Sequence, residues 1–83
     1  MNEVAIREKI KEYIHQATFA DKDKIQNDSL IFKEGYFDSM GFVVLIGYLE
    51  ENFGVKTTDS ALIEENFESI NAITNFIIKK KSN

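Results

Sequence analysis

The chain has 83 residues and a formal net charge of −4, with 43% hydrophobic residues, no proline, no tryptophan and no cysteine. This length predicts one domain, residues 1–83, with a modest core, and the absence of proline favours helices over a sandwich of short strands. Without cysteine the chain has no disulfide framework, no thiolate metal site and no cysteine nucleophile, and one histidine with scattered carboxylates gives no metal-ligand spacing.

The charge pattern and the apolar runs indicate which surroundings and partners to expect. The N-terminus becomes charged too early for a signal peptide, and the longest apolar run, from Phe42 to Leu49, is too short to span a bilayer. We therefore expect a cytoplasmic protein without membrane insertion. Between Glu34 and Glu68 eight acidic residues accompany one basic residue, Lys56. This imbalance disfavours nucleic acid and favours basic protein partners, although a solvated acidic surface explains it equally well.

The first helix is predicted over residue 3 to about residue 17, followed by a long connection. Apolar residues recur there at spacings of three and four, namely at Ile6, Ile10, Tyr13, Ile14 and Ala17. Asn2 is a good capping residue for its start. The connection runs from about Thr18 to Phe37. Its apolar residues are expected to anchor it over the helix ends: Ile25, Leu30, Phe32 and Tyr36 or Phe37.

A second helix is predicted from Ser39 to about Phe53. Asp38 and Ser39 are both favoured capping types at its start, and Gly54 is typical of a helix end. The stripe expected to face the core consists of Val43, Ile46, Leu49 and Phe53, with Phe42 and Leu45 beside it. The opposite side holds Met40, Val44 and Tyr48 or Glu51, together with Gly41 and Gly47. Such an apolar second face indicates either a docking surface or a helix buried on two sides.

The C-terminal part is predicted to contain one short and one longer helix. Thr58 or Asp59 is a suitable cap for a short third helix around Asp59 to Ile63. The segment from Glu64 to Glu68 is predicted to turn, with Phe67 as an inward anchor. Ser69 then caps a last helix whose apolar stripe is Ile70, Ile73, Phe76 and Ile77. The expected fold class is all-α, a four-helix bundle with three longer helices, one short third helix and a long first loop.

Ser39 is the residue with the clearest chemical potential. At the start of a helix, unpaired N–H groups and the positive end of the helix dipole favour a phosphate. A serine nucleophile needs a nearby base, but the one histidine, His15, lies on the first helix and nothing places it near Ser39. We therefore expect no catalytic residue and interpret His15 as an ordinary helix-surface residue. Ser39 is then either a plain helix cap or a hydroxyl that another enzyme modifies.

The wider pattern around Ser39 resembles the acyl and peptidyl carrier protein family. The resemblance rests on the run from Leu30 to Met40, on Leu45 and Leu49-Glu50, and on Phe53-Gly54-Val55. The run from Asn66 to Ile73 is similar to that family's turn into its last helix, so the resemblance covers essentially the whole chain. It implies that Ser39 accepts 4′-phosphopantetheine from coenzyme A through a separate phosphopantetheinyl transferase. The thiol of that arm would carry acyl, aminoacyl or peptidyl groups as thioesters, and the protein itself would not be an enzyme.

The resemblance also implies partner-facing residues and a type of pathway. Asp38 and Met40 match positions that the transferase and other partners contact, and Val44 matches a partner-facing position on the same helix. Typical fatty-acid carriers have leucine after the serine and acids at the positions of Gly41 and Val44. The sequence here is closer to stand-alone aminoacyl carriers, such as D-alanine carriers, and to nonribosomal peptide carriers. The implied partners are an acyl- or aminoacyl-loading enzyme and downstream transferases, which a monomer would visit in turn. The alternative is a module that is never loaded and binds a partner through Met40 and Val44.

Overall fold

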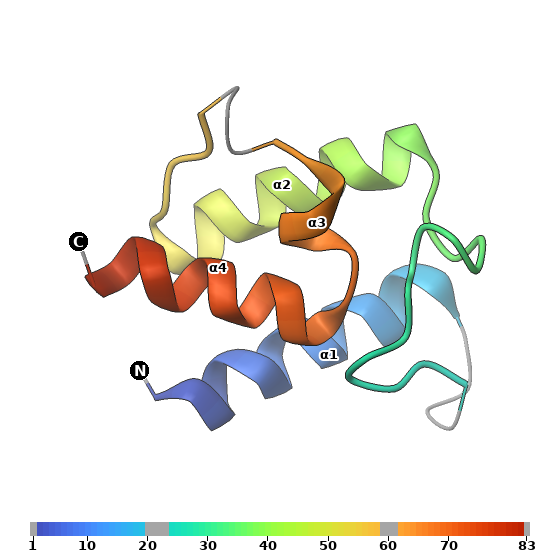
Figure 1. Ribbon diagram of the computed structural model, residues 1–83, viewed down its shortest axis with the longest axis horizontal. Helices are drawn as coiled ribbons and strands as arrows, with labels where there is room; N and C mark the ends of the chain where they lie inside the picture. Colours follow the sequence, from blue (N-terminus) through green and yellow to red (C-terminus); the bar gives the residue numbers. More distant parts are fainter. Residues whose placement is uncertain (1, 20–23, 59–61, 83) are drawn as a thin grey trace.

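The computed structural model describes residues 2–19, 24–58 and 62–82. Within these ranges the chain forms four helices and no strand: α1 (Glu3–Thr18), α2 (Ser39–Phe53), α3 (Glu64–Phe67) and α4 (Ile70–Ser82). α1 packs along α4, α3 packs against α4, and α2 lies above α4 and α1 in the view of Figure 1. The start of α1 and the end of α4 lie at one side of the molecule, and α2 begins at the other side. The predicted all-α fold, with three longer helices, a short third helix and a long first loop, is confirmed.

The predicted caps of α1 and α4 and the predicted stripe of α4 are confirmed, and the stripe of α1 is confirmed except at Ala17. The Asn2 side chain accepts a hydrogen bond of 2.8 Å from the Ala5 N–H, and the Ser69 hydroxyl accepts one of 3.0 Å from the Ala72 N–H. These bonds satisfy N–H groups that have no partner inside the helix. The apolar stripes are buried at Ile6, Ile10 and Ile14 of α1 and at Ile70, Ile73, Phe76 and Ile77 of α4. Of the remaining predicted stripe residues of α1, Tyr13 is half-buried and Ala17 is exposed.

The long first loop is anchored by Ile25, Ile31 and Phe37, which are all buried. Ile31 was not among the predicted anchors; its neighbour Leu30 was, and Leu30 is only half-buried. The Ile31 N–H donates to the Glu68 carbonyl at 2.9 Å, and the Ile31 carbonyl accepts from the N–H groups of Tyr36 and Phe37. Because these bonds fix the backbone of Ile31 between two segments, its side chain enters the core. Phe32 and Tyr36 pack against the core while partly exposed.

The predicted position of the short third helix is wrong. Leu62 and Ile63 are not helical, and α3 instead covers Glu64–Phe67, where a turn was predicted; residues 59–61 lie outside the described ranges. Ile63 precedes the helix in an extended conformation and makes no side-chain capping bond. The helix is held instead by Phe67, which is fully buried as predicted. Glu64 and Glu65 also suit the positive end of a helix dipole in the first turn.

The predicted start and end of α2 are confirmed. Gly54 follows the helix with a positive φ of 65°, and its N–H donates to the Glu50 carbonyl at 3.1 Å. A left-handed conformation of this kind suits glycine because it has no side chain. The Lys81 ammonium donates to the Phe53 carbonyl at 2.9 Å, which joins the end of α4 to the end of α2.

Candidate functional site

The start of α2 presents an exposed serine beside a capping aspartate. Asp38 is the N-cap residue, and its carboxylate accepts a hydrogen bond of 2.8 Å from the Gly41 N–H. Ser39 is the first residue of the helix and is exposed. Within the described ranges, no hydrogen bond involves the Ser39 hydroxyl. The structure therefore assigns the cap to Asp38 and leaves the Ser39 side chain exposed.

The packing of Phe37 fixes this turn and explains a small residue next to it. Gly41 lies against the buried Phe37 ring, so that a Cβ added at Gly41 would stand 2.6 Å from Phe37 Cδ1. The Phe37 N–H also donates to the Ile31 carbonyl at 3.2 Å. A larger residue at position 41 would therefore require the Phe37 ring to move, so that glycine suits the close contact between the loop and the helix. The loop, held in this way, leads directly into Asp38 and Ser39.

Ser39 lines a hollow of about 360 Å³ between the start of α2 and the segment that leads into α3. The other residues that line it are Phe32, Asp38, Phe42, Val43, Leu62 and Glu64. The rings and aliphatic side chains give this hollow an apolar surface, and the two carboxylates are its charged groups. The surroundings of the Ser39 side chain are therefore mainly apolar.

The outward surface of α2 is apolar over its first two turns. Met40 is 72% exposed and Val44 is 57% exposed, as expected for the predicted partner-facing residues. Val43 was predicted to face the core and is 64% exposed, so that part of the prediction is wrong. The buried residues of α2 are Leu45, Leu49 and Phe53, with Phe42 and Ile46 half-buried beside them. This stripe is rotated about the helix axis relative to the predicted one, and Val43 falls outside it.

A second hollow, of about 350 Å³, lies on the side of α2 that faces α1. Asp38, Gly41 and Val44 line it from α2, and Tyr13 and Ala17 line it from α1. The loop between these helices completes it with Gly35, Tyr36 and Phe37. Asp38 therefore borders both hollows, and Val43 and Val44 border one each.

Tyr48 closes the contact between α1 and α2. Its ring is stacked on that of Tyr13 with 4.1 Å between the ring centroids, and its hydroxyl donates to the Lys9 carbonyl at 3.3 Å. Burial raises the pKa of both phenols, and Glu12 and Tyr13 raise that of Tyr48 further. Tyr48 is therefore a neutral packing residue rather than part of the exposed surface.

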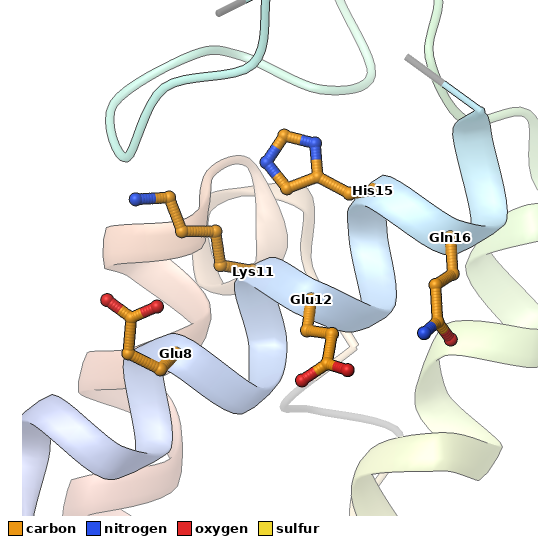
Figure 2. Close-up of a pocket in the computed structure, with 5 residues that line it drawn as sticks. All are labelled: Glu8, Lys11, Glu12, His15 and Gln16. Carbon is orange, nitrogen blue, oxygen red and sulfur yellow. The ribbon is translucent and has the colours of Figure 1, made fainter. Parts of the chain in front are cut away.

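His15 lies outside both hollows at the start of α2. It lines a third hollow of about 490 Å³ with Glu8, Lys11, Glu12 and Gln16, which all belong to α1. Figure 2 shows its ring pointing away from the helix axis, apart from the two carboxylates. The interpretation of His15 as an ordinary surface residue is wrong in one respect. Its ring nitrogens are both covered and have no hydrogen-bond partner among the described residues, and the side chain as a whole is half-buried.

No helix in the described ranges is both long enough and apolar enough to cross a bilayer. The same residues contain no group of three or more histidine, aspartate or glutamate side chains placed to hold a metal ion.

Comparison with known proteins identifies the family. Residues 6–77 match the family described as "Phosphopantetheine attachment site". An acyl carrier protein of Buchnera aphidicola subsp. Baizongia pistaciae (strain Bp) is 39% identical over 75 residues, which cover 90% of this chain and 92% of that protein. Proteins of this family are carriers rather than catalysts, and they interact with phosphopantetheinyl transferases and acyl-handling enzymes. The chain belongs to the acyl carrier family of phosphopantetheine-binding proteins, and its cofactor is covalently attached 4′-phosphopantetheine.

Proposed function

We propose that Ser39 is the attachment residue and that the protein carries acyl or aminoacyl groups between the enzymes of a biosynthetic pathway. The observation that carries this proposal is the exposed Ser39 hydroxyl at the first position of α2, beside an aspartate that caps the helix in its place. A phosphate ester on this oxygen would stand at the positive end of the helix dipole. Ser39 also lies inside the matched range of residues 6–77.

The residues around Ser39 fit a phosphodiester-linked arm. When bound, the group supplies the thiol that carries cargo as a thioester, and the chain has no cysteine of its own to do so. Asp38 holds the first turn of the helix, and Phe37 packed on Gly41 fixes its entry. His15 lines neither hollow at the start of α2. The base that takes the proton of the Ser39 hydroxyl is therefore expected to come from the transferase.

Partner enzymes are proposed to recognise the carrier through contacts with Asp38, Met40 and Val44. No charged residue occurs between Ser39 and Leu49, while Asp38 precedes this stretch and Glu50 and Glu51 follow it. A complementary partner would present an apolar centre flanked by basic side chains. Gly41 and Val44 occupy positions where typical fatty-acid carriers have acids, and Met40 occupies the position of their leucine. These differences favour a specialised aminoacyl or peptide pathway over general fatty-acid synthesis. The carrier would act as a cytoplasmic monomer.

A second candidate function is an interaction module that is never loaded. It is favoured by the exposure of Met40 and Val44, which would serve a partner with or without an attached arm. The two candidates differ in whether Ser39 is modified.

The first experiment therefore tests modification of Ser39. The purified protein is incubated with coenzyme A and a promiscuous phosphopantetheinyl transferase, and its intact mass is measured. We expect the mass of one 4′-phosphopantetheine to be added to the wild type and to a Ser29→Ala control, and none to be added to Ser39→Ala. Circular dichroism should show equal helix content in all three proteins. A well-folded wild type that gains no mass with several transferases would favour the unloaded module.

A further inference from the structure

Five phenylalanine rings form a continuous series behind Ser39. The ring centroids lie 6.0 Å apart for Phe37 and Phe32, and 5.5 Å apart both for Phe32 and Phe42 and for Phe42 and Phe67. Phe67 and Phe76 follow at 4.9 Å. These contacts are edge-to-face or tilted, the arrangements that aromatic rings prefer. The series, called the aromatic wall below, connects the first loop, α2, α3 and α4.

The aromatic wall runs from the hollow at Ser39 into the buried core. Phe32 and Phe42 line the hollow together with Ser39. Phe42 contacts Phe67, which is fully buried, and Phe67 contacts Phe76, which is 8% exposed. A chain that started at Ser39 and entered the core between α2 and α3 would therefore meet Phe42 first and Phe67 behind it.

We propose that the aromatic wall keeps cargo out of the core and that Phe42 is the residue that sets this limit. The proposal rests on the proposed attachment at Ser39. Protein interiors are packed as densely as organic crystals, so a long alkyl chain could enter only by displacing rings that already contact one another. Cargo would then remain outside the bundle, and long and short acyl groups would be held alike. This property suits a carrier of short groups, because a short cargo gains little from a cavity.

The test compares acyl chains of different length on the same protein. Wild-type protein is loaded by a promiscuous transferase from acetyl-, octanoyl- and tetradecanoyl-coenzyme A. A ligand bound only by the folded state raises the melting temperature, so a chain taken into the core would stabilise the protein. We expect equal melting temperatures and equal rates of thioester hydrolysis for the three wild-type forms. A melting temperature that rises with chain length, together with slower hydrolysis, would overturn the proposal.

Two variants of Phe42 show whether this residue is the barrier. Phe42→Leu shortens the side chain at this position, and Phe42→Ala removes nearly all of it. In both variants we expect the tetradecanoyl form to have a higher melting temperature than the acetyl form of the same variant. Phe53→Ala is the matched control, because Phe53 is a buried ring on the same helix that contacts Tyr48. This control should be destabilised equally in all its acyl forms. If Phe42→Ala fails to fold, Phe42→Leu provides the comparison.

The outcomes separate this inference from the proposed function. If no acyl form can be made, the attachment at Ser39 is wrong and the inference falls with it. If loading succeeds and the melting temperature of the wild type rises with the length of the acyl chain, only the inference is wrong. If the melting temperature is independent of acyl-chain length both in the wild type and in every Phe42 variant that folds, Phe42 is not the residue that keeps cargo out of the core. Backbone amide spectra of the tetradecanoyl and acetyl forms give a second readout, and shifts at Phe67 and Phe76 in the wild type would also overturn the inference.

Discussion

The two faces of α2 carry similar residues in opposite surroundings. Leu45 and Leu49 are fully buried on one face, whereas Met40 and Val44 are mostly exposed on the other. Burial of each leucine side chain stabilises the fold by on the order of 1.5–3 kcal/mol. The exposed Met40 and Val44 side chains contribute little of this transfer free energy. Folding of this chain therefore does not account for the apolar outer face, which agrees with its proposed use as a docking surface.

The two glycines within α2 also differ in their surroundings, one close to a packed ring and the other exposed. Gly41 belongs to the inner side, where the Phe37 ring occupies the space that a Cβ would need. Gly47 is exposed, and an added Cβ there would have no atom within 4 Å. Glycine within a helix is destabilising by roughly 0.5–1 kcal/mol relative to alanine. The inner glycine is therefore explained by packing, and the outer glycine is not.

Replacement of Gly41 by alanine should give the largest effect. The gain in helix propensity should be outweighed by the steric overlap with Phe37, because overpacking of a dense site costs roughly 1–3 kcal/mol. We expect the free energy of unfolding, measured by urea denaturation, to fall by about 1–2 kcal/mol after this offset. An unchanged or higher stability would show that the Phe37 ring moves aside easily, and would weaken the view that this contact fixes the entry to α2.

The residues that were predicted correctly are those whose signal is local. Asn2, Asp38, Ser69 and Gly54 cap helices through bonds to residues close in sequence. The position of Ser39 also followed from the type of residue at a helix start. These features need no knowledge of the rest of the fold.

The features that could not be predicted depend on distant contacts. α2 is apolar nearly all round, so its periodicity does not determine which way it is rotated, and Val43 was assigned to the wrong face. A helix as short as α3 is not stable by propensity alone, and its place is decided by Phe67 packing against Phe42 and Phe76. Ile31 is buried through a backbone bond to Glu68, far along the chain. The aromatic wall joins four segments, and no local pattern indicates it.

Replacement of Gly47 by alanine should have a smaller effect of the opposite sign. Nothing stands in the way of the new methyl group, and we expect the free energy of unfolding to rise by about 0.5–1 kcal/mol. Loading at Ser39 should be unchanged, because Gly47 lines neither hollow at the start of α2. The measurement is again urea denaturation, in parallel with Gly41→Ala. A loss of stability at both positions would show that packing against Phe37 does not distinguish Gly41 from Gly47.

The smallest effect concerns Glu50, at the exposed end of the same helix. Its carboxylate accepts hydrogen bonds from the Thr57 hydroxyl at 2.7 Å and from the Thr57 N–H at 3.1 Å, and these bonds lower the pKa of Glu50. A carboxyl group whose pKa is lower in the folded state stabilises the protein above its unfolded-state pKa. That contribution is lost as the pH falls through the folded-state pKa. Because the group is exposed, the contribution is small.

Glu50→Gln should therefore lower the melting temperature at neutral pH and have less effect below the usual pKa range of glutamate. Glu51→Gln, on the same turn of α2, controls for the removal of one exposed carboxylate. The quantity to measure is the difference in melting temperature between wild type and each variant along a pH series. A difference for Glu50→Gln that stays constant with pH would mean that the ionised carboxylate is not what holds Thr57. The connection after α2 would then be fixed by its packing, with Val55 as the buried residue beside Thr57.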